Sequence, residues 1–238
     1  MPLLRGERIR KDFGGLRAVD DVDFHIDEGE IVGLVGPNGA GKTTLFNVVS
    51  GYYQPTVGKV HFDGEEIQGL QPYQVCRKGI ARTFQVPRPL LKLSVFTNVL
   101  VGCLFGRPGG GSEADCRPEA ERIIDFLSMG AYRNTLAQMA TLAASKTLEI
   151  GRALATAPKL ILLDEVVAGL NPIETERVIA KIQQIRESGI TVFFVEHVMR
   201  AVMSVSDRIY VLNFGRRIAE GSPEQISSNP DVIEAYLG

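Results

Sequence analysis

The chain has 238 residues and 45% of them are hydrophobic, which is enough for one large domain or two small ones with a substantial core. Its 26 basic and 28 acidic residues leave a formal net charge of −2. This balance argues against a nucleic-acid partner, since such partners usually require a strong basic excess.

Cysteine usage and the apolar segments set two further expectations. Three cysteines, an odd number without CxxC spacing, indicate reduced thiols, in the core or incidental. The N-terminal residues do not read as a secretory signal, and the apolar stretch 95–105 is shorter than the roughly 20 residues of a membrane-spanning helix. We therefore expect any membrane association to go through a partner.

Short apolar runs that end in polar residues alternate with helical patterns along the chain. These runs lie at residues 30–36, 159–165 and 191–197. They are typical of strands buried on both faces of a parallel sheet. Helices are predicted over 42–51 and 173–188, and residues 213–215 read as the turn of a late hairpin. The alternation predicts an α/β fold.

The stretch from 89 to 155 is helical instead. It is interrupted by a Gly-rich loop at 106–118, and Pro118 is expected to open the helix that follows. We interpret 89–155 as a helical subdomain inserted into an α/β core made of residues 1–88 and 156–238.

"GLVGPNGAGKTTLF" (33–46) follows a predicted strand, opens a helix and fits the spacing GxxxxGK[ST]. Glycines let backbone N–H groups wrap a triphosphate closely, and the helix start adds positive potential. Lys42 is expected on the β- and γ-phosphates, and the Thr43 hydroxyl on Mg²⁺. The nucleotide-contacting residues predicted from this loop are Gly36, Pro37, Asn38, Gly39, Ala40, Gly41, Lys42, Thr43 and Thr44.

Two carboxylates end the run at 159–165. Strand ends of a parallel sheet share one edge, so Asp164 and Glu165 are expected to face the nucleotide. Asp164 would hold Mg²⁺, and Glu165 would orient or deprotonate the attacking water. His197 ends the next strand, which favours a γ-phosphate contact over the structural role of most lone histidines. Phe13 could stack on a base or pack in the core.

Taken in order, these residues resemble the ATP-binding-cassette (ABC) ATPases over nearly the whole chain. The order is an aromatic residue, the phosphate loop, Gln85 about forty residues on, a helical insert, the acid pair and a histidine. The NKxD motif of Ras-type GTPases is absent. The segments "FGGLRAVDDVDF", "ARTFQ", "DEVVAGLNP", "VEHVM" and "EGSPEQISSNPDVIEAYLG" are similar to the ATPase subunit of branched-chain amino-acid importers.

The resemblance implies a P-loop NTPase (RecA-like) core with a mainly parallel sheet, an antiparallel β part near the N-terminus, and Mg²⁺-dependent ATP hydrolysis. It also implies that Gln85 joins Mg²⁺ and the attacking water to the helical subdomain, and that Phe13 stacks on adenine. The turn 168–171 would cross to a second subunit. There, Asn171 replaces the commoner Asp, and Val166 replaces the usual proline after the glutamate.

The signature LSGGQ of the family falls on "ATLAA" (140–144), where Thr141 keeps a hydroxyl and both glycines are missing, with Ala143 at the second of them. In the family this helix start contacts the γ-phosphate held by the opposite subunit. If either position requires a left-handed backbone, the substitution costs roughly 1–2 kcal/mol. The sequence therefore predicts a weakened signature, with Thr141 and Ala143 as its nucleotide-facing residues.

A weakened signature favours a heterodimer with a second ABC ATPase subunit, although a homodimer stays open. The resemblance further implies permease subunits, an external solute-binding protein as an indirect partner, and a cytoplasmic position on the inner face of the membrane. Two alternatives remain open: the ATPase of an exporter of lipid or polysaccharide, and a soluble ABC ATPase outside transport.

Overall fold

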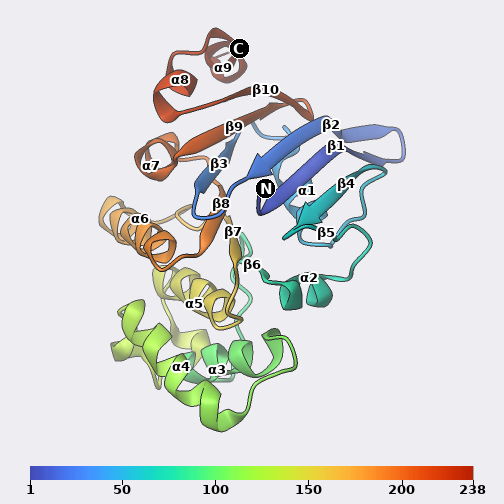
Figure 1. The fold of residues 1–238 in the computed structure, drawn as a ribbon. Helices are drawn as coiled ribbons and strands as arrows, with labels where there is room; N and C mark the ends of the chain where they lie inside the picture. Colours follow the sequence, from blue (N-terminus) through green and yellow to red (C-terminus); the bar gives the residue numbers. More distant parts are fainter. Residues whose placement is uncertain (238) are drawn as a thin grey trace.

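The computed structural model describes residues 1–237 and contains two β-sheets with helices on their faces (Figure 1). The larger sheet has six strands in the order β10-β9-β3-β8-β7-β6. Their bounds are β10 Arg216–Gly221, β9 Arg208–Asn213, β3 Ile31–Val35, β8 Thr191–Val195, β7 Leu160–Asp164 and β6 Ile80–Arg82. All neighbouring pairs are parallel except β9 and β10, which form the expected hairpin.

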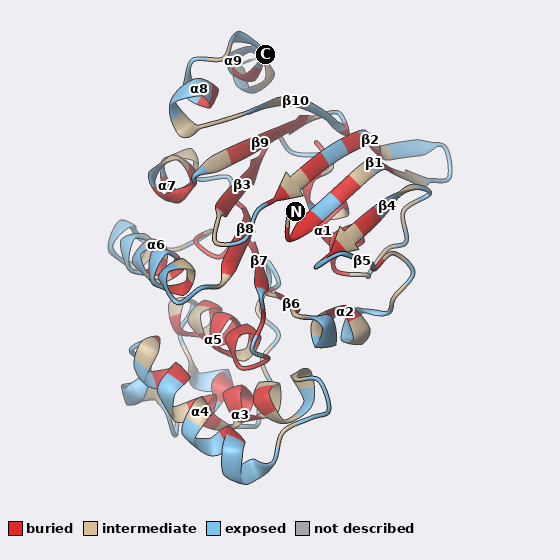
Figure 2. Ribbon diagram, viewed as in Figure 1, coloured by how far each residue is buried: buried red, intermediate tan, exposed pale blue. Residues whose placement is uncertain are grey.

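Strand β3 is buried on both faces, as its apolar run predicts. Ile31 and Val35 belong to one hydrophobic cluster, whereas Val32 and Leu34 belong to the other. Strands β7 and β8 are likewise buried at every position. Figure 2 shows this burial along the centre of the molecule. The parallel sheet therefore separates two layers of core.

The second sheet is antiparallel and lies near the N-terminus, as expected. It has the order β2-β1-β4-β5. Its strands are β1 Leu4–Phe13, β2 Leu16–Ile26, β4 Val57–Phe62 and β5 Glu65–Glu66. Helix α1 (Lys42–Val49) shares a hydrophobic cluster with both sheets, and its Phe46 ring packs against Phe193 of β8 with centroids 4.8 Å apart. This packing fixes where α1 begins relative to the strand ends.

The remaining helices cover the other face and the two ends of the larger sheet (Figure 1). They are α2 Pro72–Lys78, α3 Val95–Gly106, α4 Glu113–Phe126, α5 Leu142–Leu154, α6 Pro172–Glu187, α7 Met199–Val205, α8 Pro223–Ser227 and α9 Pro230–Leu237, with short 3₁₀ turns η1 Gly130–Tyr132 and η2 Ala137–Met139. Helices α3, α4 and α5 gather at the end of the sheet near β6 (Figure 1). Among residues 1–237, no helix combines the length and apolar character needed to cross a membrane.

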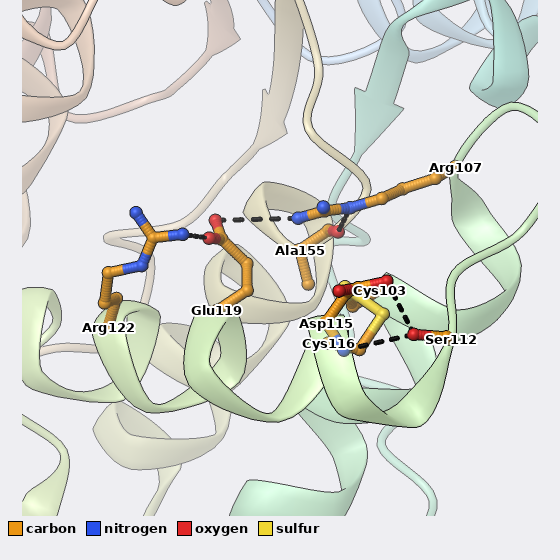
Figure 3. The surroundings of a disulfide bond; sticks show 8 residues. All are labelled: Cys103, Arg107, Ser112, Asp115, Cys116, Glu119, Arg122 and Ala155. Atoms are coloured by element: carbon orange, nitrogen blue, oxygen red, sulfur yellow. Dashed lines mark hydrogen bonds and ion pairs between the residues drawn. A yellow bond between two sulfur atoms is a disulfide. The ribbon is translucent and has the colours of Figure 1, made fainter.

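Two expectations for the helical stretch are wrong. Pro118 lies inside α4 and does not open it, because Ser112 caps the helix by accepting a hydrogen bond from the Asp115 N–H. The expectation that all three cysteines are reduced thiols is also wrong. Cys103 of α3 and Cys116 of α4 form a disulfide with their Cα atoms 5.6 Å apart (Figure 3), and Cys76 is the free cysteine. The packing of α3 on α4 brings the two sulfurs together.

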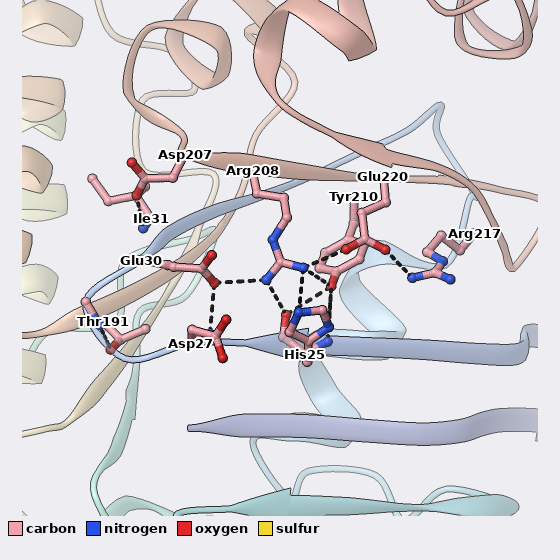
Figure 4. Close-up of polar contacts among 11 residues, drawn as sticks. His25, Asp27, Glu30, Ile31, Thr191, Asp207, Arg208, Tyr210, Arg217 and Glu220 are labelled. Atoms are coloured by element: carbon pink, nitrogen blue, oxygen red, sulfur yellow. Dashed lines mark hydrogen bonds and ion pairs between the residues drawn. The ribbon is translucent and has the colours of Figure 1, made fainter. Parts of the chain in front are cut away.

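A polar network joins β9 of the larger sheet to β2 of the antiparallel sheet (Figure 4). Arg208 of β9 donates to the His25 carbonyl in β2 at 3.0 Å and to Glu30 at 2.9 Å, and it also pairs with Glu220. Burial raises the pKa of Tyr210, beside this arginine, to about 12. His25 is therefore held in a structural network.

Candidate nucleotide-binding site

Four parallel strands deliver the predicted site to one edge of the larger sheet. Strand β3 leads into the phosphate loop, β7 ends at Asp164, β8 leads to His197, and the segment after β6 carries Gln85. The register pairs Asp164 with Val195, which aligns the carboxyl ends of β7 and β8. The arrangement follows the rule that ligands bind at the carboxyl ends of parallel strands.

The phosphate loop takes conformations that only glycine adopts easily. Gly36 has φ +151° and Gly41, directly before α1, has φ +101°. A methyl group on Gly36 would overlap the Leu212 carbonyl oxygen, and one on Gly41 would overlap that of Ala18. The chain therefore has no room for side chains at the two glycines that frame the loop.

Lys42 lies inside this loop, buried to 5% exposure. Its ammonium donates to the carbonyl oxygens of Gly36 at 2.7 Å and Pro37 at 2.9 Å. Burial lowers its pKa, and the charges of Glu165 and Asp164 oppose that effect. The loop thus holds a cation at the start of α1, where the helix N–H groups add positive potential for an anion.

The carboxylate of Glu165 is clamped between the two other predicted catalytic side chains. Gln85 donates to Glu165 Oε2 at 2.6 Å, and His197 Nε2 lies 2.6 Å from Glu165 Oε1. The side chain of Glu165 is 9% exposed, whereas that of His197 is 40% exposed and reaches the surface. The structure therefore joins Glu165 to one residue 80 positions before it and to another 32 positions after it.

The side chain of Asp164 pairs with Arg82 and not with the cluster around Glu165. Its Oδ2 accepts a hydrogen bond from Arg82 at 2.8 Å, and both side chains are at most 10% exposed. Arg82 also donates to Asn47 of α1 and to Ser50, which follows that helix as its C-cap. The residue that was expected to hold Mg²⁺ is therefore oriented by a buried ion pair that the sequence did not reveal.

A cavity of about 520 Å³ opens beside these groups. Its lining residues are Phe13, Leu16, Arg17, Ala18, Asn38, Gly39, Ala40, Gly41, Lys42, Thr43, Thr44, Gln85, Glu165, His197 and Phe214. Phe13 is 40% exposed and packs edge-on against Tyr53 with ring centroids 5.1 Å apart. The cavity thus combines an exposed aromatic face, a cationic loop and a carboxylate.

The residues around the loop suit a magnesium ion. Thr43 and Gln85 line the cavity, and Asp164, which pairs with Arg82, is the last residue of β7 and directly precedes Glu165 of the lining. These are oxygen donors of the hard type that Mg²⁺ prefers. Thr43, Gln85 and Asp164 would hold the ion, which would supply charge neutralisation for a bound triphosphate.

The signature segment starts α5 without backbone strain. Thr141 caps the helix, its hydroxyl accepting from the Ala144 N–H at 3.2 Å. Neither Leu142 nor Ala143 has a positive φ, so the cost expected for a left-handed backbone does not apply here. Leu142 is 49% exposed at the first helical position. Its side chain lies where the family signature has a glycine.

Sequence reasoning missed Arg82, Lys146 and Glu196. Lys146 and Glu196 are buried and the Arg82 side chain is 10% exposed, and each bonds to Asp164, Glu165 or the turn that follows them. Glu196 directly precedes His197, and Arg82 stands three residues before Gln85, so their position beside motif residues was the available signal. At Asn171, by contrast, the departure from aspartate is accommodated, because its side chain and that of Glu174 form a capping box for α6.

The phosphate loop, the buried lysine and the clamped carboxylate define a P-loop nucleotide-binding protein with ATPase architecture. A family model described as ABC transporter matches residues 19–168, and one described as branched-chain amino acid ATP-binding cassette transporter matches residues 216–238. The chain belongs to the ABC transporter family of ATP-binding cassettes.

Curated relatives and solved structures cover the whole chain. The high-affinity branched-chain amino acid transport ATP-binding protein BraF of Pseudomonas aeruginosa is 42% identical, over 100% of this chain and 98% of its own. LivG of Escherichia coli, of the same description, is 38% identical with the same coverage. The ADP conformation of MJ1267, an ATP-binding cassette of an ABC transporter, superposes with a TM-score of 0.91 at 34% identity, covering 100% and 99%.

Proposed function

We propose that this chain binds and hydrolyses Mg-ATP to energise an ABC importer of branched-chain or related amino acids. The observation that carries the catalytic part is the Glu165 carboxylate clamped between Gln85 and His197 beside the phosphate loop. The amino-acid substrate is supported by the names of full-length relatives.

In the proposed reaction, Lys42 and the loop N–H groups bind the β- and γ-phosphates, and Phe13 stacks on the base. Glu165 accepts a hydrogen bond from the attacking water and orients it in line with the γ-phosphate. His197 contacts the γ-phosphate, and Gln85 reports the occupied site to the helical stretch 89–155. Both side chains must leave Glu165 for this, so the observed clamp corresponds to a resting arrangement.

An exposed apolar surface suits the proposed permease partner. It comprises Val86, Leu90, Leu91, Leu93, Leu136 and Met139. The two segments of this surface are joined by hydrogen bonds from the N–H of Ala137 to Leu93 and of Gln138 to Leu91. The surface begins one residue after Gln85, so a docked permease would sense the state of the nucleotide site. Through such a partner the chain would reside in the cytoplasm on the inner face of the membrane, with a solute-binding protein acting from outside.

The signature favours a heterodimer with a second ATPase subunit. In the proposed dimer, this chain's loop and acid pair form one site with the partner's signature, and its own "ATLAA" faces the other. There the exposed Leu142 side chain would stand between the α5 N–H groups and a γ-phosphate. A tight ATP-dependent homodimer with fast hydrolysis, formed by the purified chain alone, would contradict this arrangement.

The catalytic proposal is tested with Glu165→Gln in the full-length chain. The variant should bind Mg-ATP with unchanged affinity by equilibrium titration, because the proposed nucleotide contacts of Lys42, the loop N–H groups and Phe13 are unaltered. Its hydrolysis rate should fall by at least about 10²-fold, the range that general base catalysis supplies. Undiminished turnover in the variant would remove Glu165 from this role.

A further inference from the structure

The main chain at Glu165 is strained. This residue has φ +50°, a left-handed conformation that costs a non-glycine residue about 1–3 kcal/mol and persists only where neighbouring groups enforce it. The conformation directs the carboxylate towards Gln85 and His197. Residue 166 is valine in this chain, so a proline ring does not restrict the turn that follows.

Two buried charged side chains hold this turn. Lys146 of α5 is 5% exposed and donates from its ammonium to the Glu165 carbonyl oxygen at 2.5 Å. Glu196 is fully buried, and its Oε1 accepts the Val167 N–H at 2.7 Å. The Glu165 N–H is bound to the Val195 carbonyl at 2.9 Å. The strained residue is thus fixed from α5, from the end of β8 and from the segment just after β8.

Within the part of the chain that the structure describes, the only side-chain hydrogen bonds of Lys146 and Glu196 are those to this turn. Lys146 makes its hydrogen bond to a backbone carbonyl although the charges of Glu196, Glu165 and Asp164 surround it. The second carboxylate oxygen of Glu196 is buried without a hydrogen-bond partner. Burying a charge without full pairing is costly, so an apolar residue would serve packing better at either position. The hydrogen bonds that they make to the turn fit a role in positioning.

We infer that Lys146 and Glu196 are positioning residues that hold the backbone of Glu165 in its left-handed conformation and thereby aim its carboxylate at the attacking water. The inference rests on the proposed hydrolysis by Glu165. Lys146 stands two residues after the signature segment on the same helix, and Leu142 in that segment lies against Gly169 of the turn 168–171. The hydrogen bond from Lys146 to the Glu165 carbonyl is therefore also a tether between α5, the helix that begins in the signature segment, and the proposed catalytic residue of the same chain.

Lys146→Met in the full-length chain removes the tether and keeps the length of the side chain. We expect kcat for Mg-ATP hydrolysis to fall about ten- to a hundredfold, the loss that a misplacement of about 1 Å can cause, while KM stays within about twofold. Lys146→Arg, which can still donate to the carbonyl, should recover most of kcat. Lys181→Met is the matched control, because Lys181 donates in the same way to the Phe126 carbonyl at 2.6 Å.

Hydrogen exchange of the nucleotide-free chain supplies a readout independent of hydrolysis. Lys146→Met should speed exchange of the Val167 and Ala168 amides by about tenfold, and Glu196→Leu should do the same for Val167. Lys181→Met should leave both amides unchanged. Wild-type kcat and exchange in Lys146→Met would overturn the inference, and so would a kcat loss of equal size in Lys181→Met.

Failure of the proposed function gives a different pattern. If Glu165→Gln hydrolyses ATP as fast as the wild-type chain, the proposed role of Glu165 is wrong, and the kcat comparison no longer concerns positioning. Exchange at Val167 and Ala168 still decides whether Lys146 and Glu196 hold the turn. Protected amides in both variants would show that they do not.

Discussion

The buried carboxyl of Glu196 makes a pH-dependent contribution to stability that can be calculated from the structure. Burial raises its pKa from 4.5 to about 7, and the hydrogen bond from the Val167 N–H and the charge of Lys146 only partly oppose this effect. The folded state therefore binds a proton more tightly than the unfolded state. The associated stability is fully present below pH 4.5 and is lost as the pH rises through 7.

A shift of about 2.5 pKa units corresponds to about 3 kcal/mol, of which about 2.5 kcal/mol falls between pH 5 and pH 8. Glu196→Gln mimics the protonated carboxyl and keeps an oxygen for the Val167 N–H. We expect the free energy of unfolding of the wild-type chain to fall by about 2.5 kcal/mol more than that of the variant over this range. Urea unfolding of both proteins at several pH values measures the difference. Parallel profiles would refute the assignment of a raised pKa to this residue.

Three further predictions concern the buried ion pair, the phosphate loop and the disulfide. Arg82→Met leaves the Asp164 carboxylate buried without its partner and should lower the free energy of unfolding by about 3–5 kcal/mol at pH 8, whereas Arg82→Lys should lose less; equal stability of all three proteins would contradict the buried pair. Gly36→Ala would make a methyl group overlap the Leu212 carbonyl oxygen. It should lower the free energy of unfolding in urea by at least about 2 kcal/mol and abolish Mg-ATP binding. A variant that binds Mg-ATP normally would exclude the observed loop conformation. Thiol titration of the unfolded chain should find one free thiol before reduction and three after it, and reduction should cost about 3 kcal/mol of stability; three thiols without reductant would disprove the Cys103–Cys116 bond.

The sequence was sufficient for the parts of the site that depend on local spacing and on strand order. The phosphate loop from Gly36 to Thr43 is encoded in consecutive residues whose backbone requirements exclude most side chains. Asp164 and His197 follow from the topology, because parallel strands place their carboxyl ends on one edge. The burial of β3, β7 and β8 follows from their apolar runs.

Contacts between distant segments could not be predicted in this way. The pairing of Arg82 with Asp164 spans 82 positions, and that of Lys146 with the Glu165 carbonyl depends on how α5 packs beside β7. The Cys103–Cys116 bond likewise depends on the packing of α3 against α4. The predicted helix start at Pro118 was wrong for a local reason, because the Ser112 cap places the start of α4 at Glu113.

In the proposed site, the loop ending at Lys42 and the carboxylates of Asp164 and Glu165 at the end of β7 act on one magnesium-bound triphosphate. Isothermal titration calorimetry of the full-length chain with Mg-ATP, beside Lys42→Ala, tests it most directly. We expect saturable heat with one site per chain in the wild-type protein, and at least a tenfold loss of affinity, about 1.4 kcal/mol, in the variant. An absence of heat in the wild-type chain, or equal affinity in both proteins, would contradict it.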